Sequence, residues 1–378
     1  MIITDLRMTP VAIPLKASCI PYHAQGKPHL AEAVLVEIFT DEGLIGVGEC
    51  PCLPGRDLAS GIVRDVKPAL IGKDPRNICG LLKGAHIKNQ FQNPLCRPNS
   101  MALIGIEMAL WDLLGKRAGL PLYKLLGGAF RKRVEFAAKV VRQDLKGMAK
   151  RAADFVSRGY NVIYTDAGID PAEDVAAVAA MREGAPCPST RLRVDANQAW
   201  STDTAIKTIN RMAEYGVELV DRPVNMRNIN DIQDVRDSVS VPISGHGSSW
   251  TMRDVLNIVM KGALDYLSLD AGFGMGYSGL RMGSGIAEAA GIQCVFRSNL
   301  SLGVSFAMNL HMIASTPNIT LANIGSVYDD LDDDVLSGGK LPSEGPYYYV
   351  PEGPGIGVGL DMGRVSKYNQ LYVREALG

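Results

Sequence analysis

Residues 191–221 read RLRVDANQAWSTDTAIKTINRMAEYGVELVD. This stretch contains a β-rich run at Arg191–Asp195, a helical pattern over Thr202–Tyr215 and a second β-rich run at Val217–Asp221. A strand, a helix and a strand in this order predict two parallel strands joined by a right-handed crossover. Each strand ends in an aspartate, so the two carboxylates are expected to lie on neighbouring strands.

The same alternation extends outward in both directions along the chain. Short β-rich runs alternate with helical stretches from Val134 onward, a pattern typical of parallel strands with helical crossovers. Eight such strands predict a closed β/α barrel. The predicted strands are Val134–Val141, Asn161–Asp166, Arg191–Asp195, Val217–Asp221, Val241–His246, Asp265–Asp270, Gln293–Arg297 and Thr320–Ile324.

The residues before the barrel have a different pattern. Runs at Ile2–Ile13, Ala33–Thr40 and Ile45–Glu49 predict an antiparallel meander, and a helical pattern over Ser100–Ala118 follows it. The predicted fold class is therefore α/β, a modified TIM barrel with an N-terminal α+β capping domain. We expect the capping domain at 1–130, the barrel at 131–328 and, at 329–378, a segment that returns to the capping domain.

Composition narrows the classes of partner. The 378 residues include 39 basic and 40 acidic side chains, a formal net charge of −1, which favours neither nucleic acid nor an anionic membrane surface. The sequence shows neither a signal peptide nor an apolar run long enough to cross a bilayer. We expect a cytoplasmic homo-oligomer that acts on a small molecule.

Barrel enzymes assemble their sites from the carboxyl ends of strands, and several predicted strands end in polar residues. Adjacent strand-end carboxylates at Asp195 and Asp221 suit Mg²⁺, although strand-end aspartates also commonly cap the following helices. The four acids that end predicted strands, Asp166, Asp195, Asp221 and Asp270, would repel one another at the mouth of the barrel unless a metal ion or Arg297 balanced their charge. The polar strand-end residues are Tyr164, Asp166, Asp195, Asn197, Asp221, His246, Asp270 and Arg297.

Four motifs resemble the mandelate racemase and muconate lactonising branch of the enolase superfamily. They are IEMALWDLLGK at 106–116, GLPLYKLLGG at 119–128, VDANQAW at 194–200 and GPGIG at 353–357. The resemblance implies Mg²⁺ held by acids that end the third, fourth and fifth strands. It also implies removal of the proton α to a substrate carboxylate, with the resulting enediolate stabilised on the metal.

This sequence departs from the family pattern at most of the implied catalytic positions. Tyr164 and Asp166 stand in the place of the second-strand lysines, and Gly247 takes the place of the fifth-strand ligand. Asp221 and Asn323 stand in place of glutamates on the fourth and eighth strands, and Arg297 in place of the seventh-strand histidine, whereas the sixth-strand Asp270 is kept.

These departures lead to specific hypotheses. Asp166 is predicted to complete a three-acid Mg²⁺ site with Asp195 and Asp221. His246 is either a ligand or base, or a packed residue. Tyr164 is either a base, if Arg297 lowers its pKa, or part of a Tyr–Arg pair that holds a substrate carboxylate. Residues predicted to bind substrate are Tyr22, Arg56, Asn197 and Asn323.

Two functions remain open at this point. One is a metal-dependent lyase or isomerase, of dehydratase, racemase or cycloisomerase type, that acts on a small hydroxy, amino or sugar acid. The other is a catalytically silent relative that keeps the fold. A site that has lost its activity is expected to contain small or apolar residues. The titratable side chains predicted at the carboxyl ends of the strands therefore favour the enzyme over the silent relative.

Overall fold

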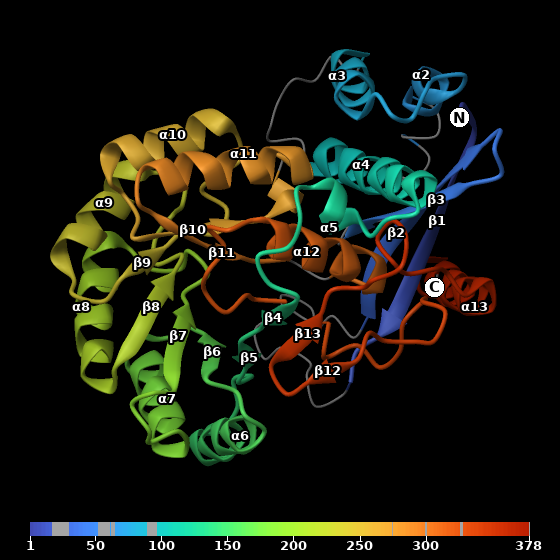
Figure 1. Cartoon of the computed structure of the whole chain (residues 1–378). Coiled ribbons are helices and arrows are strands. Elements are labelled where there is room, and N and C mark those ends of the chain that lie inside the picture. Colours follow the sequence, from blue (N-terminus) through green and yellow to red (C-terminus); the bar gives the residue numbers. More distant parts are fainter. Residues whose placement is uncertain are drawn as a thin grey trace.

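The computed structural model (Figure 1) describes residues 1–16, 30–51, 61, 65–88, 97–273, 275–298, 301–325 and 328–377. Its N-terminal part is a three-stranded antiparallel sheet in the order β1-β2-β3, which confirms the predicted meander. The strands are β1 (Ile3–Pro14), β2 (Leu30–Thr40) and β3 (Ile45–Pro51). The helices that follow are α2 (Lys67–Leu70), α3 (Ile78–Lys88), α4 (Arg97–Ala118) and α5 (Leu122–Leu125).

Helix α4 packs closely on this sheet. Its apolar residues Ile106, Ala109, Leu110 and Leu113 are buried in the same cluster as residues of β1 and β2. Gly48 on β3 permits the close approach, because a Cβ atom there would lie 1.9 Å from the Gly105 carbonyl oxygen of α4. The long helix therefore covers one face of the meander.

A curved parallel sheet forms the centre of the second part. Its seven strands follow the order β11-β10-β9-β8-β7-β6-β5, so strands that are consecutive along the chain are also neighbours in space. The parallel pairing confirms the β/α alternation read from the sequence. The strands are β5 (Ala138–Lys139), β6 (Val162–Asp166), β7 (Arg191–Asp195), β8 (Val217–Asp221), β9 (Ile243–Ser244), β10 (Tyr266–Leu269) and β11 (Gln293–Phe296).

The eighth predicted strand, Thr320–Ile324, is present as isolated bridges rather than as a continuous strand. Ile324 bridges Arg297 beside β11, and Asn323 bridges Phe136, which lies just before β5. These parallel bridges connect the two edges of the seven-stranded sheet, so the segment closes the ring. The fold is the predicted modified TIM barrel with a capping domain.

The helices that connect the strands lie on the outside of the sheet (Figure 1). Several begin at a side chain that accepts a hydrogen bond from the first turn, including Asp144, Asp170, Ser201, Asn228 and Thr251. The helices are α6 (Leu145–Ser157), α7 (Pro171–Gly184), α8 (Thr202–Met212), α9 (Ile229–Ser238), α10 (Met252–Lys261), α11 (Gly276–Ala289) and α12 (Gly303–Ser315), with 3₁₀ turns η2 (Ala213–Tyr215) and η3 (Ala271–Phe273).

The C-terminal segment returns to the N-terminal part of the chain. Strand β12 (Ser343–Glu344) pairs with β13 (Tyr347–Tyr349), which pairs with β4 (Arg133–Glu135) at the start of the barrel. The last helix, α13 (Met362–Leu377), packs against β1, and the Asn369 amide donates to the Pro10 carbonyl oxygen at 2.8 Å. In the described part of the chain, we find no helix with the length and apolar character needed to cross a membrane.

A buried histidine joins the barrel to both of the other parts. His311 on α12 accepts the Tyr123 backbone N–H at Nδ1 (3.2 Å), and its Nε2 lies 3.1 Å from the Ile356 carbonyl oxygen. Burial lowers the pKa of His311 to about 4, against a usual value of 6.5. The folded protein therefore keeps this imidazole neutral across a range in which an unfolded chain would protonate it.

This histidine predicts an acid-sensitive stability. Because its folded pKa lies below its unfolded value, its contribution is complete above pH 6.5 and is lost as the pH falls towards 4. We expect the free energy of unfolding to fall by about 2 kcal/mol between pH 7 and pH 5 because of His311 alone. Urea unfolding of wild type and His311→Gln at both pH values measures this. The same pH dependence in both proteins would contradict it.

Candidate active site

The carboxyl ends of β7 and β8 bring two aspartates side by side. Asp195 and Asp221 lie on neighbouring strands, as the sequence predicted. They are register partners and are 1% and 3% exposed. The backbone N–H of Asn197 donates to Asp195 Oδ1 at 3.0 Å, and that of His246 donates to Asp221 Oδ1 at 2.9 Å. Each carboxylate thus keeps its second oxygen, Oδ2, for another partner.

That partner is Arg297, which follows β11. Its Nη1 donates to Asp221 Oδ2 at 2.6 Å and its Nη2 donates to Asp195 Oδ2, so one guanidinium bridges both carboxylates. Arg297 is itself buried. The sequence suggested Arg297 as a balancing charge for the strand-end acids, Asp270 among them, or as part of a clamp for a substrate carboxylate. The structure pairs it with Asp195 and Asp221, two of those acids.

A second guanidinium, that of Arg222, also binds Asp195. Its Nε donates to Asp195 Oδ1 at 2.9 Å, and its Nη2 donates to Asp195 Oδ2 and, at 2.7 Å, to Asn197 Oδ1. Arg222 has a φ of +52°, and Asn197 and Gln198 also have positive φ values. Left-handed backbone is costly for residues other than glycine and is concentrated at functional sites.

Sequence reasoning did not identify Arg222 as a site residue. The only signal was its place directly after the strand-end Asp221. The left-handed backbone that brings its side chain back over Asp195 cannot be read from residue type.

The two arginines dominate the electrostatics of this pair of acids. Burial alone would raise the pKa of the Asp195 carboxyl, but Arg297 and Arg222 outweigh burial and hold that pKa far below its usual range. Burial alone would likewise lower the pKa of Arg297, but Asp195 and Asp221 outweigh it and raise that pKa. Asp195 and Arg297 therefore stay charged throughout the physiological range.

A histidine and an aspartate pair beside this network. His246 Nε2 lies 3.0 Å from Asp270 Oδ2, and Asp270 Oδ1 accepts the Gly272 N–H at 2.7 Å. His246 follows the fifth barrel strand, β9, and Asp270 follows the sixth, β10. Burial lowers the pKa of His246, and Arg297 lowers it further against the opposing effect of Asp270. The geometry is that of a neutral imidazole oriented by a carboxylate.

Lys139 and Asp166 form a separate ion pair on the first and second barrel strands. Lys139 Nζ lies 2.7 Å from Asp166 Oδ2, and its side chain is 19% exposed. Burial alone would lower the pKa of Lys139, but Asp166 and Tyr164 raise it overall, so the amine is held as an ammonium. Burial outweighs the nearby cations and raises the pKa of Tyr164 to about 12. This high pKa opposes the predicted role of the Tyr164 phenolate as a base.

The residues present do not fit the predicted Mg²⁺ site. Asp166 was predicted as the third ligand, but it pairs with Lys139, while Asp195 and Asp221 share Arg297. Among the described residues, no three His, Cys, Asp or Glu side chains come together as metal ligands. Magnesium binds through carboxylate oxygens, and here Asp195 Oδ2 and Asp221 Oδ2 already accept from a guanidinium, while Asp166 Oδ2 pairs with an ammonium.

The residues predicted to bind substrate lie in different environments. Asn323 is buried, its Oδ1 accepts the Phe296 N–H at 3.1 Å, and its Nδ2 donates to the Glu135 carbonyl oxygen, so it holds the barrel closed instead. Asn197 is exposed and bonds to Arg222 at the mouth. The predictions for Tyr22 and Arg56 lie outside the described residues.

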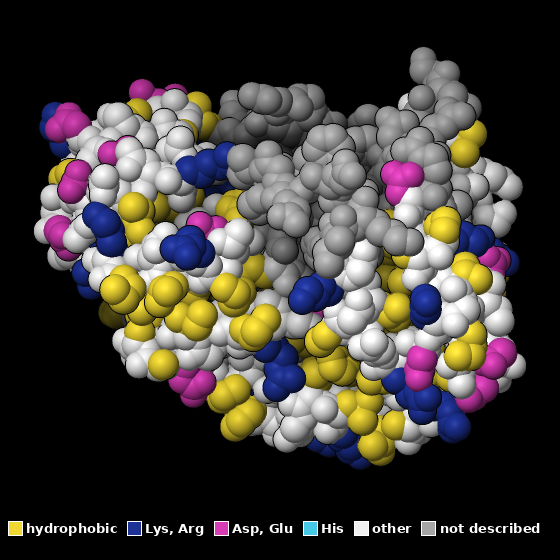
Figure 2. Space-filling model, turned by 90° about the horizontal axis from the view of Figure 1, so that it is seen from above, with side chains coloured by type: hydrophobic (Ala, Val, Ile, Leu, Met, Phe, Trp, Pro, Cys, Tyr) yellow, Lys and Arg dark blue, Asp and Glu magenta, His cyan; other side chains and the backbone are white. Residues whose placement is uncertain are grey.

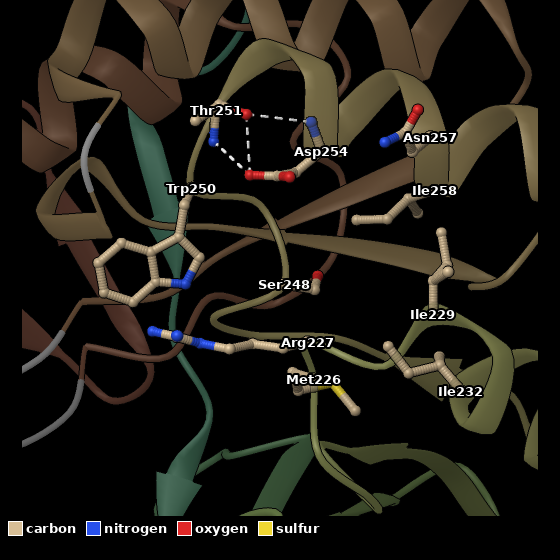
Figure 3. A pocket seen from close by; sticks show the side chains of 10 residues that line it. All are labelled: Met226, Arg227, Ile229, Ile232, Ser248, Trp250, Thr251, Asp254, Asn257 and Ile258. Carbon is tan, nitrogen blue, oxygen red and sulfur yellow. Dashed lines mark hydrogen bonds between the residues drawn. The ribbon is translucent and has the colours of Figure 1, made fainter. Parts of the chain in front are cut away.

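A pocket is lined by residues that are close in sequence to Asp221 and His246 (Figure 3). It has a volume of about 460 Å³ and lies between helices α9 and α10, beside the loops that follow β8 and β9. Ile229, Ile232 and Ile258 form an apolar wall, and the Arg227 guanidinium lies 5.7 Å from the Trp250 ring centroid at the opposite end. The pocket shares the β9–α10 loop with His246.

The charged surface is mixed in sign. Figure 2 shows Lys and Arg side chains interspersed with Asp and Glu among the described residues of one face. The formal net charge of −1 is compatible with such a mixture.

Comparisons with known proteins agree with the fold and the motifs. Residues 5–127 match the model of the mandelate racemase / muconate lactonizing enzyme N-terminal domain, and residues 147–364 match the enolase C-terminal domain-like model. The chain is 30% identical over 345 residues to a hydrophobic dipeptide epimerase of Enterococcus faecalis, which covers 89% of this chain and 94% of the epimerase. It is 27% identical to muconate cycloisomerase 1 of Rhodococcus opacus over 89% of this chain and 91% of that enzyme.

Solved structures show the same similarity. A substrate-liganded L-Ala-D/L-Glu epimerase from Bacillus subtilis superposes with a TM-score of 0.85 at 28% identity, covering 95% of this chain and 99% of the epimerase. An enolase from Streptomyces coelicolor, solved without Mg, gives a TM-score of 0.89 at 27% identity and covers 99% of this chain and 98% of its own. The chain belongs to the mandelate racemase / muconate lactonizing enzyme branch of the enolase superfamily.

Proposed function

We propose that this chain is an isomerase- or lyase-type enzyme that removes the proton α to the carboxylate of a small hydroxy, amino or sugar acid. The observation that carries the proposal is the pairing of His246 with Asp270. The resemblance to this branch implies that the sixth-strand aspartate would orient a histidine on the seventh strand. Here Arg297 follows the seventh strand, and Asp270 pairs with a histidine that follows the fifth strand.

His246 is suited to accept a proton. When Nε2 carries the hydrogen directed at Asp270, Nδ1 is the ring nitrogen with the basic lone pair. Its lowered pKa keeps the imidazole neutral near pH 7, the form a base requires. In the proposed step the α C–H bond breaks, the proton moves to this imidazole, and the electron pair moves into the carboxylate to give an enediolate.

Lys139 is suited to the opposite task. Its strand, β5, and the His246 strand, β9, lie at the two ends of the run β5-β6-β7-β8-β9, which places them across the ring from each other. Lys139 is held protonated and is partly exposed, so it can donate a proton or bind a carboxylate. Two groups with oppositely shifted pKa values on opposite sides support epimerisation, in which one removes a proton and the other returns it.

Deuterium exchange tests this function directly. Small dipeptides, hydroxy acids and sugar acids are incubated with the protein in D₂O, and α-deuteration is followed by NMR and mass spectrometry. We expect exchange with at least one acid, and a fall of about 100-fold in its rate in His246→Asn and Asp270→Asn. Asp265→Asn is the control, because Asp265 bonds to Arg236 and the Ile243 N–H at the amino end of the same strands.

A second function, the silent relative, is favoured by one observation. His246 is 1% exposed, and Asp166, Asp195 and Asp221 each have a cationic partner, an arrangement that also serves as a purely structural network. The same exchange experiment separates the two functions. Absence of exchange across the whole panel, or wild-type exchange in His246→Asn, would reject the enzymatic proposal.

A further inference from the structure

The bridging guanidinium of Arg297 lies where two strand-end carboxylates would otherwise share a cation. Its two terminal nitrogens reach one oxygen each of Asp195 and Asp221. Guanidinium is planar, permanently charged and able to bind two carboxylates through parallel N–H groups. It therefore provides both the positive charge and the bridging geometry that a bound ion would provide.

Charge balance opposes a further cation at this position. Asp195 and Asp221 carry two negative charges, and Arg297 and Arg222, which both contact Asp195, carry two positive charges. The buried cluster is therefore neutral without a metal. A divalent ion would leave two uncompensated positive charges in a site where Asp195, Asp221 and Arg297 are all buried, which is costly.

The ligand count points in the same direction. The fifth barrel strand provides Gly247 at the position that the family resemblance assigns to a ligand. Asp166 is bound to Lys139 at 2.7 Å. A metal here would have to break the contacts of Arg297, and it would gain only two carboxylates in return.

We propose that Arg297 is a built-in replacement for the divalent cation of this enzyme family, so the site needs no metal. Its charge is +1 and is fixed to the chain, whereas a bound ion carries +2 and exchanges with solvent. The inference concerns the free protein, and it stands whether or not the proton transfer proposed above takes place.

Manganese binding to the purified full-length chain tests this inference without any substrate. Mn²⁺ is titrated into wild type, and free Mn²⁺ is followed by its electron paramagnetic resonance signal. We expect no saturable binding at micromolar concentrations and no rise in melting temperature with added Mn²⁺ or Mg²⁺. One bound Mn²⁺ per chain in wild type, lost in Asp221→Asn, would overturn the inference.

A second variant supplies a positive prediction. Arg297→Ala frees Asp221 Oδ2 and removes one of the two guanidinium groups that bind Asp195. We therefore expect added Mn²⁺ to raise its melting temperature, an effect that wild type does not show. Arg211→Ala is the matched control, because Arg211 is an exposed arginine on α8 and should behave as wild type does. The wild-type titration decides the inference even if Arg297→Ala fails to fold.

Discussion

Replacing Arg297 with methionine is expected to lower the free energy of unfolding by about 3–5 kcal/mol at neutral pH. Methionine preserves much of the apolar volume but removes the charge that holds Asp195 and Asp221 together. Asp195 keeps Arg222 as a partner, whereas Asp221 loses its closest cation, because the Arg222 Nε lies 4.0 Å away. A buried carboxylate without a close counter-charge is among the costliest defects that one substitution creates.

A double-mutant cycle isolates this effect. Arg297→Met combined with Asp221→Asn removes one of the two carboxylates that lost a partner, so the double variant should be more stable than the sum of the single losses predicts. Arg211→Met on the surface of α8 should change stability by less than about 0.5 kcal/mol. Chemical denaturation of the four variants measures both effects. An Arg297→Met protein as stable as wild type would show that the ion network contributes nothing to stability.

Removing the Asp112 carboxylate is expected to cost about 3–5 kcal/mol. Asp112 on α4 is fully buried and accepts the N–H of Val47 on β3 at 2.9 Å and that of Ile356 at 2.9 Å. Lys116 Nζ lies 2.6 Å from the same carboxylate. Asp112→Ala would leave two buried backbone donors without their acceptor. Lys116 would lose its counter-charge and keep only the Ile45 carbonyl oxygen, at 2.7 Å. The junction of the sheet, helix and C-terminal segment would therefore weaken.

Two measurements test the role of Asp112. Urea unfolding gives the loss of stability, and limited proteolysis reports whether the glycine- and proline-rich stretch around Gly355 becomes accessible. Asp112→Asn keeps one acceptor oxygen and should show an intermediate loss. Asp154→Ala removes an exposed carboxylate on α6 whose nearest cations lie 3.5 and 3.7 Å away, so it should change little. Equal losses in Asp112→Ala and Asp154→Ala would contradict the prediction.

The sequence predicted the barrel well because its strands and helices have distinct local patterns. The strand ends at Asp166, Asp195 and Asp221 are in the predicted places, and their register follows from parallel pairing of consecutive strands. The eighth strand was harder, because residues 319–324 form isolated bridges whose pairing depends on both edges of the sheet.

The partners of the site residues were less predictable than their positions. Which neighbour a strand-end side chain meets depends on side-chain rotamers and on backbone that follows the strand. Asp270 pairs with His246 rather than with Arg297, and Asp166 pairs with Lys139. Arg222 reaches Asp195 only because its backbone is left-handed. The sequence did indicate that something positive must balance the acids, and it named Arg297 as one candidate.

The most direct test is a crystal structure of wild type soaked in Mn²⁺, with an anomalous difference map. We predict guanidinium density for Arg297 between Asp195 and Asp221 and no anomalous peak within about 2.5 Å of either carboxylate. A manganese peak bridging the two carboxylates, with Arg297 displaced, would contradict the central claim.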